Sequence, residues 1–127
     1  LRVNPQVGTM NPLHCTALGK ALLAFGDLEP PHEFERYTKR TIQSKSSLLV
    51  NLEDIRKVGY AVDDEEFDPG VRCIAVPIYD FRGKVVGSMG ISGPSSRVTT
   101  DKLPHLAAIV VETGKALSER LAFSRQE

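Results

Sequence analysis

Two strand-like runs within residues 71–92 constrain the fold more than any other part of the sequence. Between them lie residues 80–83, with the sequence DFRG, which suits a four-residue hairpin loop. If this loop is symmetric, Cys73 lies opposite Gly90, and Val71 lies opposite Ser92. We therefore expect an antiparallel hairpin, and we consider its two faces separately because successive side chains of a strand point to opposite faces.

The two faces of this hairpin differ in character. One face is apolar and predicts a core surface: Ile74, Val76, Ile78, Val85, Met89 and Ile91. The other face collects small residues, several of which can hydrogen-bond: Cys73, Ala75, Ser88, Gly90 and Ser92. Small side chains leave a hollow, which either a closely packed helix or a small polar ligand can fill. Both fillings stay open at this stage, and both can hold at different points of one face.

Helices are predicted before the hairpin. The first covers residues 16–25, with Thr16 as its N-cap, Gly26 as its stop, and an apolar stripe of Leu18, Leu22 and Phe25. A second short helix is expected after Pro30 and Pro31, and it includes Phe34 and Tyr37. A third begins within the serine-rich residues 44–47 and ends at Gly59, with Leu48, Leu52 and Ile55 on one face.

The remaining segments complete an α+β pattern. Residues 1–7 are predicted to be the end of a strand, followed by a turn, and residues 60–63 are predicted to be a strand. After the hairpin, a last helix runs from about Thr100 to Leu121, with Pro104 in its first turn. Its expected buried stripe is Leu103, Leu106, Val110, Thr113, Leu117 and Leu121. This order of elements predicts a mainly antiparallel sheet flanked by helices.

Composition excludes several classes of function. The 127 residues, 41% of them hydrophobic, suffice for one modest core. The 16 basic and 16 acidic residues leave no positive surplus, so direct binding of nucleic acid by these residues is not expected. No apolar run is long enough for a signal peptide or a membrane span, and the two cysteines suit a reduced, cytoplasmic compartment. Because the chain opens at Leu1 without a methionine, we expect it to be a piece of a longer protein.

Four ordered motifs resemble the C-terminal effector-binding domain of IclR-type bacterial transcription regulators. They are residues 12–24 (PLHCTALGKALLA), 59–66 (GYAVDDEE), 70–77 (GVRCIAVP) and 91–94 (ISGP). The resemblance implies a GAF-like or PAS-like fold, a curved antiparallel sheet flanked by helices, across residues 1–127, without the domain's first helix and strands. It also implies a winged helix-turn-helix domain, upstream of and absent from this chain, through which such regulators bind DNA, and assembly into homodimers or homotetramers.

The resemblance also implies a set of ligand-binding residues. The family's helix-start segment matches Thr16, Ala17, Leu18 and Gly19, whose amide hydrogens are expected to bind a carboxylate. Asp63 matches an acidic residue that accepts hydrogen bonds from a ligand hydroxyl. Alternatively, Asp63 has no role in binding and is a solvated charge or an internal partner of Arg72. For Glu65 and Glu66 we prefer this second interpretation. The site is completed by Cys73, Ser88, Gly90 and Ser92.

The expected effector is a small organic acid or sugar acid, and no cofactor is expected. Some family members carry serine where this chain has Gly90, so the glycine is predicted to remove a hydroxyl and to enlarge the hollow. Effector binding is expected to shift the populations of two arrangements of the domains, and thereby to control DNA binding. The sequence does not name the compound.

Three other functions compete with this one. An enzyme that uses Cys15 or Cys73 with His14 as base is not expected, since adjacent residues do not face one another and no nucleophile motif is present. A metal site is not expected either, because the spacing gives no CxxC or HxxxH pair. The alternative that stays open is a structural oligomerisation domain without a ligand, which a cognate acid would not stabilise.

Overall fold

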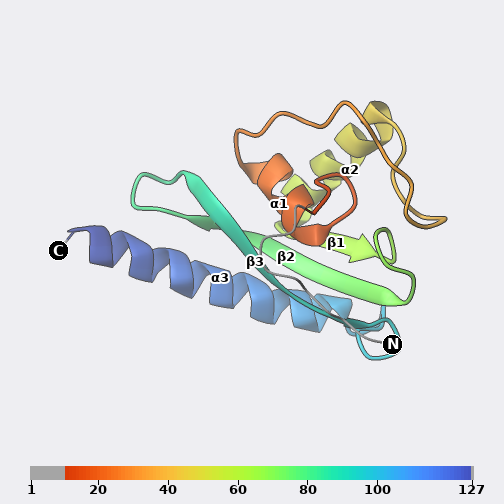
Figure 1. Ribbon diagram of the computed structural model, residues 1–127. Helices are drawn as coiled ribbons and strands as arrows, with labels where there is room; N and C mark the ends of the chain where they lie inside the picture. Colours follow the sequence, from red (N-terminus) through yellow and green to blue (C-terminus); the bar gives the residue numbers. More distant parts are fainter. Residues whose placement is uncertain (1–10, 127) are drawn as a thin grey trace.

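The computed structural model describes residues 11–126, of which residues 123–126 are described by their backbone alone. Three strands form one sheet in the order β1-β2-β3, and the helices lie on both of its faces. In Figure 1, α1 and α2 cover one face and α3 runs along the other. The predicted α+β class, with an antiparallel sheet flanked by helices, is confirmed. The strand predicted within residues 1–7 lies outside the described residues.

Helix α1, Ala17–Phe25, begins and ends where the sequence predicts, but it buries a different face. The Thr16 Oγ1 atom accepts a hydrogen bond from the Gly19 amide, and Gly26 ends the helix. The predicted stripe is wrong, because Leu18 is 45% exposed. The buried face consists mainly of small side chains: Ala17, Gly19, Lys20, Ala21, Leu23 and Ala24. Small residues allow a close approach to the sheet, and this steric fit outweighs the larger apolar side chains.

Helix α2, Lys45–Val58, agrees with the prediction in its caps and in its face. The Ser44 Oγ atom accepts a hydrogen bond from the Ser47 amide, and Gly59 leaves the helix with a left-handed φ of 89°. Leu48, Leu52 and Ile55 are buried in the core between α1 and the sheet. Capping and periodicity therefore predicted this element correctly.

Residues 27–43 contain no helix, so the helix predicted after Pro30 and Pro31 is wrong. Two consecutive prolines remove two amide donors and keep the preceding residue out of the helical region. Further along, the Thr41 Oγ1 atom accepts hydrogen bonds from the amides of Tyr37 and Thr38, at 3.0 and 2.8 Å. A threonine side chain thus satisfies amides that a helix would otherwise have to pair.

The sheet is antiparallel throughout and consists of β1 (Ala61–Asp64), β2 (Val71–Tyr79) and β3 (Val85–Pro94). Cys73 pairs with Ser92, and Ala75 pairs with Gly90. The predicted register, with Cys73 opposite Gly90, is therefore displaced by two residues. An even displacement leaves the side chains on their predicted faces, so Cys73, Gly90 and Ser92 still share one face.

The register differs because the hairpin loop is asymmetric. The Asp80 amide donates to the Lys84 carbonyl, which leaves a loop of three residues ending in Gly83 with a φ of 77°. A second irregularity follows between Ile78 and Tyr79, beyond which the register has moved by one more residue. Val85 pairs with Tyr79 and lies on the face opposite to the one predicted for it.

Helix α3, Leu103–Gln126, packs against the apolar face of β2. Its buried residues include Ala107 and Val110, which contact Ile74 and Val76. The second half of the predicted stripe is wrong: Thr113 is exposed, and Leu117 and Leu121 are 41% and 39% exposed. Instead Gly114 faces the sheet, where a β-carbon would lie 2.6 Å from Val76 Cγ2. Among the described helices, none has the length and hydropathy needed to cross a membrane.

Candidate ligand-binding site

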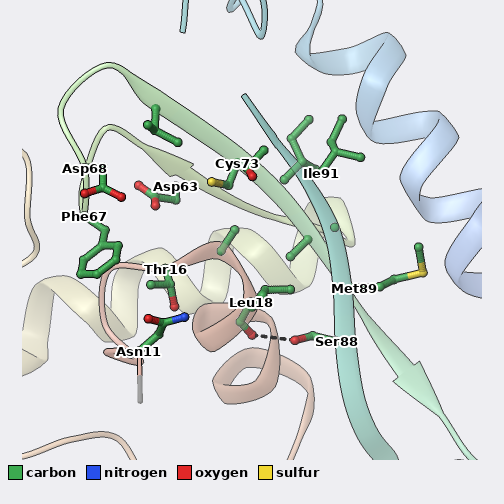
Figure 2. A pocket seen from close by; sticks show the side chains of 16 residues that line it. Asn11, Thr16, Leu18, Asp63, Phe67, Asp68, Cys73, Ser88, Met89 and Ile91 are labelled. Atoms are coloured by element: carbon green, nitrogen blue, oxygen red, sulfur yellow. Dashed lines mark hydrogen bonds between the residues drawn. The ribbon is translucent and has the colours of Figure 1, made fainter. Parts of the chain in front are cut away.

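A hollow of 620 Å³ lies between the start of α1 and the small-residue face of the sheet. Figure 2 shows side chains from α1, from the segment after β1, and from β2 and β3 around it. The volume lies within the range of small-molecule sites. Eight of the nine predicted site residues line the hollow: Thr16, Ala17, Leu18, Asp63, Cys73, Ser88, Gly90 and Ser92.

The first turn of α1 presents backbone amides to this hollow. The Gly19 amide is already bonded to Thr16 Oγ1, which in turn donates to the Pro12 carbonyl at 2.7 Å. Gly19 is not a lining residue, since it packs on Leu13, and we therefore leave it out of the site. Within residues 11–126, the amides of Ala17 and Leu18 donate to no protein acceptor. Unpaired amides at the positive end of a helix dipole are suited to bind an anion.

Asp63 is the buried acid of the hollow. Its side chain belongs to β1, the residue is only 3% exposed, and its Oδ1 atom accepts a hydrogen bond of 2.7 Å from the Glu66 amide. Burial, together with the nearby Glu66 carboxylate, raises the pKa of Asp63 to about 7, against the lowering effects of the Glu66 and Phe67 amides and the Lys20 ammonium. Near neutral pH the Asp63 side chain can therefore be ionised, and accept hydrogen bonds, or protonated, and donate one.

Asp63 is neither a solvated charge nor a partner of Arg72. It is buried, and Arg72 pairs with the next residue, Asp64. Arg72 contacts Asp64 Oδ1 through Nε at 2.9 Å and through Nη2 at 2.8 Å, and it lies 3.9 Å from Glu65. Glu65 agrees with its predicted role as a partner of Arg72. Glu66 does not, since it is 8% exposed and its carboxylate pairs with Lys20 at 2.9 Å.

Both thiols are protonated near neutral pH. Burial, together with the Asp63 carboxylate, raises the pKa of Cys15 and of Cys73 to about 12. A thiol in this state is a poor nucleophile and acts as a small apolar group with a weak donor. Cys73 lines the hollow and hydrogen-bonds the Ser92 side chain, whereas Cys15 is fully buried and is not among the lining residues.

The β3 residues line the hollow in different ways. Ser88 donates its hydroxyl to the Leu18 carbonyl at 3.0 Å, the bond drawn in Figure 2, so it ties β3 to α1. At Gly90 a β-carbon would overlap the Ile74 carbonyl oxygen and would lie 2.9 Å from Ala75 Cα. The close approach of β2 thus requires a glycine at this position, a constraint that adds to the predicted loss of a hydroxyl.

Sequence reasoning missed three polar or aromatic residues of the hollow, namely Asn11, Phe67 and Asp68. Phe67 and Asp68 follow Asp63 in the same short connection to β2, and that proximity was the signal available in the sequence. In Figure 2, the Asp68 carboxylate lies on the same side of the hollow as Asp63. No lysine, arginine or histidine is found among the described residues that line the hollow, so the groups there that can attract an anion are the backbone amides at the start of α1.

The histidine considered as a catalytic base is bonded to the backbone. The His14 Nε2 atom bonds to the Glu35 carbonyl at 2.9 Å, and its ring packs edge-on against Phe34. Within the part of the chain that the structure describes, no three His, Cys, Asp or Glu side chains converge to hold a metal ion.

A hollow lined by acids, hydroxyl groups and apolar side chains, between a helix start and an antiparallel sheet, is suited to hold a small molecule. The model of the bacterial transcriptional regulator IclR C-terminal family matches residues 1–119. The chain therefore belongs to the IclR family of transcription regulators, in which it corresponds to the C-terminal effector-binding domain. The predicted family is confirmed.

Curated relatives agree with this assignment. The transcriptional regulator KdgR of Escherichia coli is 36% identical over 129 residues, which cover 97% of this chain and 49% of KdgR. BhcR of Paracoccus denitrificans is 38% identical over 121 residues, 91% of this chain and 43% of BhcR. The chain spans about half the length of the curated relatives it matches. These relatives are transcription regulators and not enzymes.

Solved structures show the same architecture. The C-terminal domain of Escherichia coli KdgR superposes with a TM-score of 0.78 at 36% identity, covering 88% of this chain and 72% of that one. A double mutant of the inducer-binding domain of PobR from Acinetobacter, in complex with 3-hydroxybenzoic acid, superposes with a TM-score of 0.81 at 27% identity, covering 93% of this chain and 73% of that one.

Proposed function

We propose that this chain senses a small organic acid or sugar acid in the hollow between α1 and the sheet. One observation carries the proposal: the amides of Ala17 and Leu18, which have no acceptor within residues 11–126, and the buried Asp63 line the same hollow. The amides suit a carboxylate, and Asp63 suits a hydroxyl or another polar group of the same molecule. The double mutant of the PobR domain, a structural neighbour, holds an aromatic hydroxy acid, which has both a carboxylate and a hydroxyl.

The remaining lining residues are proposed to complete the site by shape and hydrogen bonding. Cys73 and Ser92 face the hollow from β2 and β3, and Thr16 lies at the helix start. Ser88 and Gly90 contribute by allowing α1 and the strands to approach closely. A ligand here contacts α1 and all three strands, so its binding is coupled to the way in which these elements pack.

We propose that this coupling controls DNA binding by a winged helix-turn-helix domain of the whole protein, in the cytoplasm. The effector can shift the equilibrium between two domain arrangements only by its difference in affinity for them. The sign of the response, repression or activation, depends on which arrangement binds the operator.

Self-association into dimers or tetramers is part of the proposal. Helix α3 exposes the apolar side chains Ile109, Leu117 and Leu121, which are 51%, 41% and 39% exposed. Exposed apolar side chains along one helix suit contact with another copy. Sedimentation velocity of the chain and of its Leu117→Glu variant would test this, with a shift of the variant towards monomer expected.

The sensor function is tested by a thermal-shift screen of the chain against pyruvate, D-gluconate and 3-hydroxybenzoate, which represent organic, sugar and aromatic acids. At 100 times its dissociation constant a ligand adds about 2.7 kcal/mol, which raises the melting temperature of a chain of this size by about 10 °C. A shift from one class, confirmed by calorimetry, supports the sensor function. A folded sample that none of them shifts favours a structural oligomerisation domain.

A matched pair of variants tests the place of binding. Asp63→Ala should weaken the binding of the acid that shifts the wild type by about tenfold to a hundredfold, the worth of one hydrogen bond to a charged group. Asp27→Ala, which removes an exposed carboxylate outside the hollow, should leave the affinity unchanged. Unchanged affinity in Asp63→Ala, with an intact circular dichroism spectrum, would remove Asp63 from the site.

A further inference from the structure

Lys20 is a fully buried cation whose three donors are all satisfied. It lies in α1, is 1% exposed, and is among the largest buried side chains of the described chain. Its Nζ atom is 2.9 Å from Asn51 Oδ1 and 2.9 and 3.0 Å from the two carboxylate oxygens of Glu66. These partners belong to α2 and to the segment after β1, so one ammonium group joins three parts of the fold.

Glu66, held by Lys20, in turn holds Asp63. The Glu66 amide donates to Asp63 Oδ1 at 2.7 Å, and its Oε2 atom accepts from the Asp64 amide at 3.1 Å. The Glu66 carbonyl accepts a further bond from Thr41 Oγ1 at 2.6 Å. The chain is therefore folded back on the end of β1, and the orientation of the Asp63 carboxylate depends on where Glu66 is held.

The pair connects the two ends of the hollow. Lys20 lies three residues after Ala17 and two after Leu18, within the same turn of α1 as the amides that face the hollow. Through Glu66 it is linked to Asp63, on the sheet side of the same hollow. A buried ion pair is a weak source of stability, because desolvation of both charges offsets their attraction, and an apolar pair of similar volume is often as stable. Its place in this fold therefore suggests a role besides stability.

We propose that Lys20 and Glu66 are positioning residues of the effector site. The pair sets the distance between the Asp63 carboxylate and the amides of Ala17 and Leu18, and through Asn51 it connects the site to α2. This inference rests on the proposed function, because it assumes that these groups contact the effector. Neither residue is a lining residue of the hollow, so the pair acts on a ligand only through Asp63 and α1.

The double variant Lys20→Met/Glu66→Met tests the proposal, since it removes both charges and leaves unbranched side chains that adapt to the space. We expect it to fold with a midpoint of urea unfolding close to that of the wild type. The amide at position 66 should exchange with solvent at least tenfold faster than in the wild type, while the amide of Leu52 in α2 stays protected. The acid from the panel that binds the wild type should bind at least tenfold more weakly.

The matched control is Lys115→Met/Glu112→Met, which removes an exposed pair on α3 whose Nζ and Oε1 atoms are 3.9 Å apart. This control should change neither the exchange rate of the amide at position 66 nor the affinity for the acid. If the double methionine variant does not fold, Lys20→Met/Glu66→Gln is used instead, because it retains an oxygen for the Asp64 amide. We then expect smaller changes in the exchange rate of the position-66 amide and in the affinity for the acid.

The proposal is overturned by a stable variant in which either the amide at position 66 stays protected or the affinity is unchanged, because a purely structural pair gives that result. A wild type that binds none of pyruvate, D-gluconate and 3-hydroxybenzoate counts against the proposed function instead. The exchange of the position-66 amide needs no ligand, so it still decides whether the pair holds Asp63.

Discussion

The buried Asp63 carboxyl predicts an unusual dependence of stability on pH. Its pKa rises from an ordinary 3.8 to about 7 in the folded chain, mainly because burial disfavours the charged form. Between these two values the folded state binds the proton and the unfolded state does not, so the free energy of unfolding falls as the pH rises. At 1.36 kcal/mol per unit, the whole shift corresponds to about 4 kcal/mol, of which about 2 kcal/mol is lost between pH 5 and pH 7.

Asp63→Asn removes this titration and keeps an oxygen that can accept the bond from the Glu66 amide. Relative to the wild type, the variant should therefore gain about 3 kcal/mol of stability between pH 5 and pH 8. Urea unfolding of both proteins at pH 5, 6, 7 and 8 measures this difference directly, and other titrating groups cancel in it. Asp27→Asn, an exposed acid, should give a curve parallel to that of the wild type. A parallel curve for Asp63→Asn would refute the reasoning.

Three further predictions concern stability and reactivity. Gly59→Ala should lose about 1–2 kcal/mol in urea unfolding, because position 59 has a left-handed φ of 89°, although no atom within 4 Å blocks a methyl group. Gly90→Ala should cost about 1–3 kcal/mol by the same measurement, because its methyl group overlaps the Ile74 carbonyl, and a normal midpoint would show that β2 and β3 adjust freely. Cys15 and Cys73 should react with iodoacetamide at pH 8 much more slowly in the folded chain than in urea, and equal rates would contradict their raised pKa values.

The sequence predicted those parts of the fold that depend on local rules. Helix α2 begins after Ser44 and ends at Gly59 as expected, and Thr16 caps α1, because capping depends on only a few neighbouring residues. The faces of the hairpin were correct for Cys73 and Ser92 even though the register was displaced, because an even displacement preserves the face. The hollow could thus be predicted from small residues on one face.

The predictions were wrong where contacts between elements, and not local sequence, determine which residues are buried or paired. The buried face of α1 follows the need for small side chains against the sheet, which the more apolar Leu18 cannot supply. The register depends on an irregularity beside Tyr79 that no single residue type signals. Lys20 was overlooked because a lysine is ordinarily exposed, and only its spacing with Ala17 and Ala24 placed it on the buried face.

A titration followed by amide resonances of the 15N-labelled chain tests the central claim most directly. With pyruvate, D-gluconate and 3-hydroxybenzoate added in turn, we predict saturable shifts for one class of acid, largest at the amides of Ala17 and Leu18 and at residues beside Asp63. A folded chain with no saturable shift, or with shifts confined to α3, would contradict the account of this hollow as an effector site.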